Sequence, residues 1–390
     1  MQIWTKGYFK REFLNRVILV TAIVSIFFPI IANKIYDHRI DYGDHIRFAL
    51  EMAQYKEIRL PHFLWHVFVI AVQKLVFPSP ETAAVIVTLA SCVFLGLIIH
   101  RSLGGLFGTV FGIELGSIGL TLALLIVTPI LLLVVLDAHV YLGYIGITTY
   151  HNPTIILLRP IALLHFGYVV HVFDNQPISK RTLALTAILT ILSTLTKPSY
   201  TICLLPSLAI LAAYKCVTKQ RLGWKFLLVG IIVPSLVVLL WQYAFTYGSL
   251  GEQDVFFAPF DVMASWSGYL LPKFMLSAMF PLCVLVFYFK EVIKDNRLVL
   301  AWIMFLCGAF YTYFLAESGS RGIHGNFWWS GQISLFILFW ISTLFVVKKK
   351  IVARGFHGVD LYLLAFVFSC HVISGILFYA VDFRFGFSAW

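Results

Sequence analysis

The chain has 390 residues, of which 60% are hydrophobic and only 12% are charged, and its mean hydropathy is +0.90. A soluble domain would carry roughly 25% charged residues, so this composition excludes one and predicts an integral membrane protein. The formal net charge of +11 would suggest nucleic-acid binding in a soluble protein, but here it must first be compared with the positive-inside rule.

Long apolar runs follow one another along the chain, separated by short polar gaps. A helical span needs about 20 apolar residues, whereas a β-barrel would show an alternating pattern, so the runs predict helices. The first run has no small-residue cleavage site and predicts an uncleaved span. We expect one all-α transmembrane domain over 1–390. Its helices, about 11 by this criterion, are expected near 16–33, 83–99, 113–136, 154–173, 183–196, 199–214, 225–246, 267–289, 298–316, 331–347 and 360–380.

The basic gaps between these runs predict the orientation of the chain. Lys and Arg residues cluster before residue 16 and at 174–182, 215–224, 290–297 and 348–359, which places these gaps and the N-terminus in the cytoplasm. The net charge is therefore an orientation signal, and we expect no nucleic-acid partner. The functional side is expected to be the outer face, most simply that of a bacterial inner membrane.

This orientation makes residues 34–82 one continuous outer segment. Asp37, Asp41 and Asp44 lie within eight residues near the outer end of the first span. They could belong to a solvated loop, or one of them could be a general base that accepts a proton from an acceptor hydroxyl while a phosphate leaves.

Two amphipathic helices are expected in this outer segment. Ile46, Ala49, Leu50 and Ala53 recur at helical spacing, and the apolar run 62–77 is too short to span and looks interfacial. The two helices would frame a lateral entrance for a lipid-borne substrate.

A cation stands between two short apolar runs at Lys197-Pro198. Interrupted spans tend to line a cavity, because their freed backbone groups need partners that lipid cannot supply. Lys197 could hold a phosphate there, or it could simply extend to the interface.

A second cation, Arg159, lies within an apolar run. A guanidinium at this depth must face protein, water or a phosphate. A structural ion pair with Asp137 or Glu317 is the alternative to phosphate binding.

The outer loop 317–330 is rich in polar and aromatic side chains. Such a loop offers donors, a cation and aromatic surfaces together, which suits a sugar or phosphate, although tryptophans alone are also common at membrane interfaces. The candidates are Glu317, Arg321, His324, Asn326, Trp328 and Trp329.

Several activities lack support in the sequence. There is no P-loop, no GxSxG, no HExxH and no dinucleotide-binding fingerprint in a strand-to-helix context. The energy must therefore come from an energy-rich substrate or a gradient.

Residues 30–210 resemble the GT-C superfamily of polytopic glycosyltransferases, which includes protein O-mannosyltransferases and the aminoarabinose transferases that act on lipid A. The resemblance rests on four segments, and it departs from the family in that the second acid of the usual pair is not adjacent to Asp41. The segments are Asp41-Tyr42-Gly43-Asp44-His45 leading into Leu50-Glu51-Met52, Pro61-His62, Asn152-Pro153-Thr154 to Arg159-Pro160, and Lys197-Pro198 with Pro206.

The resemblance implies transfer of a sugar from a polyprenyl-phosphate carrier to a glycan, lipid or protein acceptor. Asp41 would be the base, with Asp44 beside it, and Lys197, Arg159, Arg321 and His324 would bind the donor phosphate. Weaker candidates for sugar or acceptor contact are His45, Glu317, Asn326 and Trp328. We expect no metal, but a divalent ion would be held by Asp41 and Asp44. A transporter or flippase, or a polymerase of lipid-linked glycans, would use the same cations.

Overall fold

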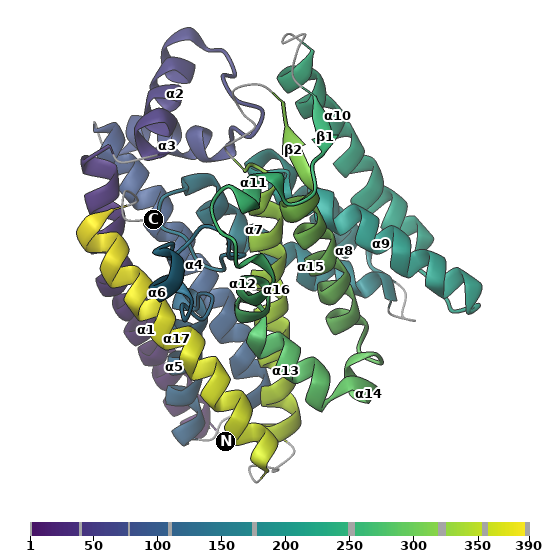
Figure 1. The fold of residues 1–390 in the computed structure, drawn as a ribbon. Coiled ribbons are helices and arrows are strands. Elements are labelled where there is room, and N and C mark those ends of the chain that lie inside the picture. Colours follow the sequence, from purple (N-terminus) through teal and green to yellow (C-terminus); the bar gives the residue numbers. More distant parts are fainter. Residues whose placement is uncertain are drawn as a thin grey trace.

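The structure of the protein is a computed structural model that describes residues 2–38, 41–76, 79–107, 111–173, 178–248, 254–318, 325–352 and 358–386. It is a helical bundle with one small pair of strands (Figure 1). The helices are α1 (Gln2–Tyr36), α2 (Asp41–Tyr55), α3 (Leu64–Leu75), α4 (Pro80–Phe107), α5 (Phe111–Ile126), α6 (Val134–Asp137), α7 (Pro153–Val169), α8 (Lys180–Thr196), α9 (Ser199–Val217), η2 (Phe226–Ile232), α10 (Val233–Tyr247), α11 (Asp261–Ala264), α12 (Leu270–Ser277), α13 (Met279–Phe287), α14 (Phe289–Val292), α15 (Asn296–Phe314), α16 (Trp328–Val346) and α17 (Val359–Phe385), with short turns η1 (Val170–Phe173) and η4 (Val347–Val352).

The described helices are those of a multi-pass membrane protein. Eight are long and apolar enough to cross a bilayer, and a ninth candidate is the pair α12 and α13, which are bent by 68° relative to each other. The eight are Glu12–Tyr36, Pro80–Gly104, Pro153–Phe173, Ser199–Val217, Phe226–Tyr247, Asn296–Phe314, Trp328–Lys349 and Val359–Phe385. The predicted all-α membrane class is confirmed.

Three of the eleven predicted spans differ from the structure. The run predicted at 113–136 is helical only to Ile126, and the chain beyond it is irregular except for α6. The run predicted at 183–196 lies in α8, which has 17 residues. The run predicted at 267–289 is divided between α12 and α13. Apolar composition alone does not reveal such breaks, because buried irregular segments can be as apolar as helices.

The helices α2 and α3 lie at one end of the bundle, which also carries α11 and the two strands (Figure 1). Helix α3 has 12 residues, too few to cross a bilayer. The buried face of α2 carries Tyr42, His45, Ile46 and Ala49, whereas Leu50 is 42% exposed. The predicted amphipathic helix is present, but its buried face includes Tyr42 and His45 rather than the predicted Leu50 and Ala53.

The two strands fix the segment after α15. Strand β1 (Val255–Phe257) pairs antiparallel with β2 (Leu315–Glu317), so that Val255 lies opposite Glu317. Because β2 directly follows α15, this pairing holds the Glu317 carboxylate near the end of α10.

Helix α16 is the most enclosed of the eight spans and packs closely on α15. At Gly308 of α15, an added Cβ would lie only 2.4 Å from Ser334 Oγ and 2.6 Å from the Ser330 carbonyl oxygen. Small residues of this kind let membrane helices approach closely. The approach fixes the first turn of α16, which carries Trp328 and Trp329.

Candidate functional site

A cavity of about 780 Å³ opens at the α2–α3 end of the bundle. Its volume lies within the range typical of ligand sites, roughly 300–1,000 Å³. The walls come from the segment before α3, the α8–α9 junction, α10, β1, β2 and the first turn of α16. Its lining includes Arg59, His62, Lys197, Ile202, Leu236, Leu239, Leu240, Gln242, Tyr243, Tyr247, Glu317, Asn326, Trp329 and Ser330.

One wall of the cavity is apolar and comes from α10. Leu236, Leu240 and Tyr243 line it and are 45%, 67% and 64% exposed. Helix α10 belongs to one of the candidate spans, which are long and apolar enough to cross a bilayer. The cavity therefore has an apolar wall on a candidate membrane-spanning helix.

Lys197 lines another wall and lies directly after the last residue of α8. It is extended, with φ −168° and ψ 126°, as expected for a residue that precedes proline. Its side chain is 8% exposed, and its Nζ lies 3.4 Å from Asn152 Oδ1, 3.3 Å from Thr154 Oγ1 and 4.5 Å from the centre of the Trp329 ring. Burial lowers the pKa of Lys197 to about 8, although the nearby Asp41 carboxylate partly opposes this shift.

Asn152 connects Lys197 with Asp41. Its Oδ1 caps α7 by accepting a hydrogen bond from the Ile155 amide at 3.0 Å, and the same oxygen faces Lys197. Its Nδ2 donates to Asp41 Oδ2 at 2.6 Å. The carboxylate and the ammonium thus share one amide, and Asp41 lies behind the cavity wall.

A second carboxylate, Glu317, lines the cavity itself. Tyr247 Oη donates to Glu317 Oε1 at 3.1 Å, and Asn326 Nδ2 donates to Oε2. These neutral donors fix the orientation of the carboxylate, which is 7% exposed.

The structure brings together part of the predicted site. Lys197, Glu317 and Asn326 line one cavity, and Asp41 is joined to Lys197 through Asn152. Arg321 and His324 lie outside the described residues.

Three other candidates face away from the cavity. Asp44 is exposed and pairs with Arg47 at 2.9 Å. His45 is buried, its Nδ1 lies 2.9 Å from His66 Nε2, and burial followed by the neighbouring histidines lowers its pKa well below the ordinary value. Trp328 is buried and donates through Nε1 to the Tyr144 carbonyl at 2.8 Å.

Arg159 is buried inside the bundle rather than at the cavity. It donates to the carbonyl oxygen of Ile147 and lies 4.9 Å from the centre of the Phe336 ring. It pairs with neither Asp137 nor Glu317. The cation is therefore held inside the bundle by the Ile147 carbonyl and the Phe336 ring.

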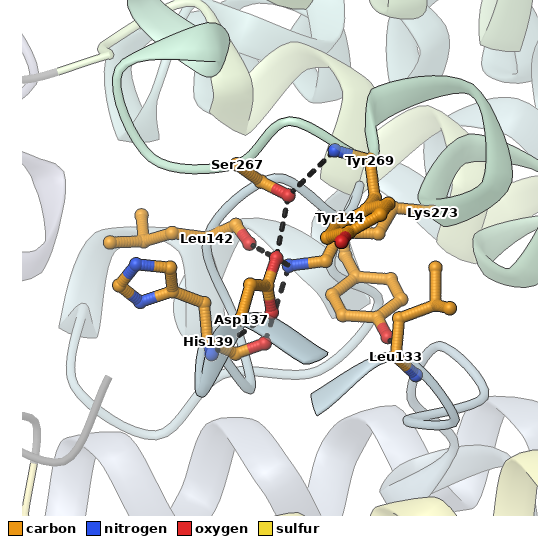
Figure 2. Close-up of polar contacts among 8 residues, drawn as sticks. All are labelled: Leu133, Asp137, His139, Leu142, Tyr144, Ser267, Tyr269 and Lys273. Carbon is orange, nitrogen blue, oxygen red and sulfur yellow. Dashed lines mark hydrogen bonds and ion pairs between the residues drawn. The ribbon is translucent and has the colours of Figure 1, made fainter. Parts of the chain in front are cut away.

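Asp137 pairs instead with Lys273 (Figure 2). Lys273 Nζ lies 2.6 Å from Asp137 Oδ2 and 3.0 Å from the carbonyl oxygen of Leu142, and Ser267 Oγ also donates to Asp137 Oδ2 at 2.6 Å. Burial acts to raise the pKa of Asp137, but the hydrogen bonds from Lys273 and Ser267 bring it below the ordinary value. This cluster fastens the irregular segment 127–152, which ends at Asn152, to α12.

Gln242 and Arg59 line the cavity but were not among the predicted site residues. Trp329 faces Lys197, whereas the sequence predicted sugar or acceptor contact for its neighbour Trp328. Gln242 is the one amide in the apolar run of α10, and such a residue inside a span is a recognisable signal. Arg59 carries no comparable signal, because it lies in a charged loop.

Among the described residues, no three His, Cys, Asp or Glu side chains converge as metal ligands. Asp44 is directed to Arg47 and Asp41 to Asn152, so the two carboxylates have different partners. No known family model matches the sequence, and no curated protein matches it.

Proposed function

We propose that the protein is a membrane glycosyltransferase that moves a sugar from a polyprenyl-phosphate carrier to a glycan, lipid or protein acceptor at the outer face. The observation that carries this proposal is the cavity, which combines an apolar wall on a spanning helix with a buried ammonium and a carboxylate. A polyprenyl-phosphate sugar has the matching parts, namely an apolar tail, an anionic link and a polar head.

In this proposal Lys197 holds the phosphate. A preorganised cation in a water-poor site stabilises the charge that develops on the leaving phosphate oxygens. Trp329, beside Lys197, offers an aromatic surface to the sugar.

The transfer breaks the bond between the anomeric carbon and the phosphate oxygen and forms a bond from that carbon to the acceptor oxygen. Polyprenyl phosphate leaves with both electrons of the broken bond, and the acceptor hydroxyl loses a proton. Asp41 is the predicted base, and its carboxylate accepts a hydrogen bond from Asn152 Nδ2, while Asn152 Oδ1 faces the Lys197 ammonium. Glu317 is a second carboxylate that lines the cavity and could accept the same proton.

The test is sugar transfer by the purified protein in liposomes that contain a polyprenyl-phosphate sugar and an acceptor. Asp41→Asn is expected to abolish transfer while donor binding persists. Asp44→Asn is the matched control, because this acid lies three residues away but faces Arg47, and it should retain transfer.

Two other outcomes of this assay would assign the base to Glu317 or the protein to a different function. Full transfer by Asp41→Asn together with loss in Glu317→Gln would move the base to Glu317. Movement of labelled lipid across the bilayer without any transfer, in the wild type, would show a flippase instead and overturn the proposal.

A further inference from the structure

Arg59 lines the same cavity as Lys197 but comes from a different element, the segment between α2 and α3. Its guanidinium lies 3.7 Å from Glu51 Oε2, 3.5 Å from Glu57 Oε2 and 5.2 Å from the centre of the Tyr55 ring. Both ion pairs are longer than a good charge-assisted hydrogen bond, which is about 2.8 Å. Arg59 is thus weakly held at the edge of a cavity.

The partners of Arg59 are solvent-accessible. The side chain of Arg59 is 37% exposed, that of Glu51 is 35% exposed and that of Glu57 is 66% exposed. Exposed pairs of this kind contribute little to stability. A phosphate would offer the planar guanidinium two short, parallel hydrogen bonds, which is a stronger interaction.

We propose that Arg59 is a second anion-binding residue. It would exchange its ion pairs with Glu51 and Glu57 for contacts with the phosphate of the lipid whose head group Lys197 also contacts. This inference rests on the proposed function for the identity of the ligand. Glu51 and Glu57 compete with the ligand for Arg59, and they hold the guanidinium at the cavity edge until the lipid arrives. The apolar α10 wall favours an amphiphile over a free anion.

Binding of a short-chain polyprenyl monophosphate to the purified full-length protein tests this role. Arg59→Ala is expected to weaken binding about tenfold, the loss of one charge-assisted contact. Arg47→Ala is the matched control, because Arg47 is an exposed arginine of α2 that pairs with Asp44 and does not line the cavity, and it should bind as the wild type does.

The competing acids give a test in the opposite direction. Combined Glu51→Gln and Glu57→Gln should tighten binding roughly threefold, because an exposed ion pair no longer has to be broken. The gain should vanish when Arg59→Ala is added. A loop that is merely disturbed by Arg59→Ala would not produce a gain that depends on Arg59.

Unchanged binding by Arg59→Ala, or no gain in the double variant, would overturn the inference while leaving the proposed function intact. Binding without sugar transfer would instead overturn the proposed function and leave Arg59 as an anion-binding residue. Inorganic phosphate is the second probe, and binding as tight as that of the lipid would overturn the assignment of an amphiphile.

Discussion

Lys197 and Lys273 are both buried lysines near aromatic rings, but their surroundings differ in one respect. Lys273 lies 2.6 Å from the Asp137 carboxylate and is also bound by backbone carbonyls. Lys197 has an amide oxygen and a hydroxyl as its nearest polar partners, at 3.4 and 3.3 Å, and makes no ion pair with a described carboxylate. The first charge is neutralised within the fold, whereas the second remains available to a ligand.

A further buried lysine, Lys34, resembles Lys273 in having a carboxylate partner. Lys34 of α1 lies 2.7 Å from Asp382 of α17, and both side chains are 1% exposed. Removing one partner of a buried pair leaves an uncompensated charge, so pairs such as these are expected to govern stability rather than binding.

The largest expected effect is the loss of stability on replacing Lys273, whose charge is neutralised by Asp137. Lys273→Met should lower the free energy of unfolding by about 3 kcal/mol, because Asp137 is left without its cation. Thermal unfolding in detergent measures this loss. Adding Asp137→Asn should recover part of the stability, and a single variant as stable as the wild type would contradict the assignment of Lys273 to the fold.

Replacing Lys197 should instead weaken ligand binding without lowering stability. Lys197→Met is expected to weaken binding of polyprenyl phosphate by about 2 kcal/mol, roughly 30-fold, because a charge-assisted contact is lost. Its unfolding temperature should stay at or above the wild-type value, because an isolated buried charge is removed. If this variant were as unstable as Lys273→Met, the distinction between the two lysines would fail.

The pH dependence of binding sharpens the same distinction. Because the pKa of Lys197 is about 8, the ammonium is present below pH 8 and is lost as the pH rises through that value. The ligand for this measurement is the polyprenyl-phosphate sugar, a phosphate diester whose charge does not change in this range. Affinity should therefore be constant near pH 7 and fall roughly tenfold per unit well above pH 8. Lys197→Arg should move this loss beyond the accessible range, and binding by the wild type that does not vary from pH 7 to 10 would contradict the prediction.

The smallest effect is expected from the aromatic ring beside Lys197. Trp329→Leu should weaken ligand binding about threefold, because a cation–π contact contributes about 0.5–1 kcal/mol at a partly exposed site. Trp328→Phe is the control, and it should lower stability instead, because the hydrogen bond to Tyr144 is lost. Equal effects of both variants on binding would contradict the placement of Trp329 alone at the cavity.

The sequence was sufficient to predict the membrane class, the two helices α2 and α3, and three of the residues that line the cavity. Lys197 could be found because a cation between two short apolar runs is costly unless it faces a cavity. Glu317 and Asn326 could be found because polar side chains are concentrated in one short loop.

Other features depend on contacts between distant parts of the chain. Asp137 and Lys273 are far apart in the sequence, and nothing local to Asp137 indicates that Lys273, rather than Arg159, is its partner. Trp328 and Trp329 are adjacent and chemically identical, so only the packing of α16 against α15 decides which ring faces the cavity. The irregular segment 127–152 is apolar enough to resemble a span.

The amide of Asn152 gives the site a property that its charges alone would not have. Because its oxygen faces Lys197 and its nitrogen faces Asp41, a single planar group keeps an acid and a base of opposite charge close together without letting them combine. Asn152→Asp would exchange one NH₂ for an oxygen and give Lys197 a carboxylate as its neighbour. At this position, the difference between a lysine that pairs with a carboxylate, as Lys273 does, and one that faces a neutral amide is therefore the identity of a single atom.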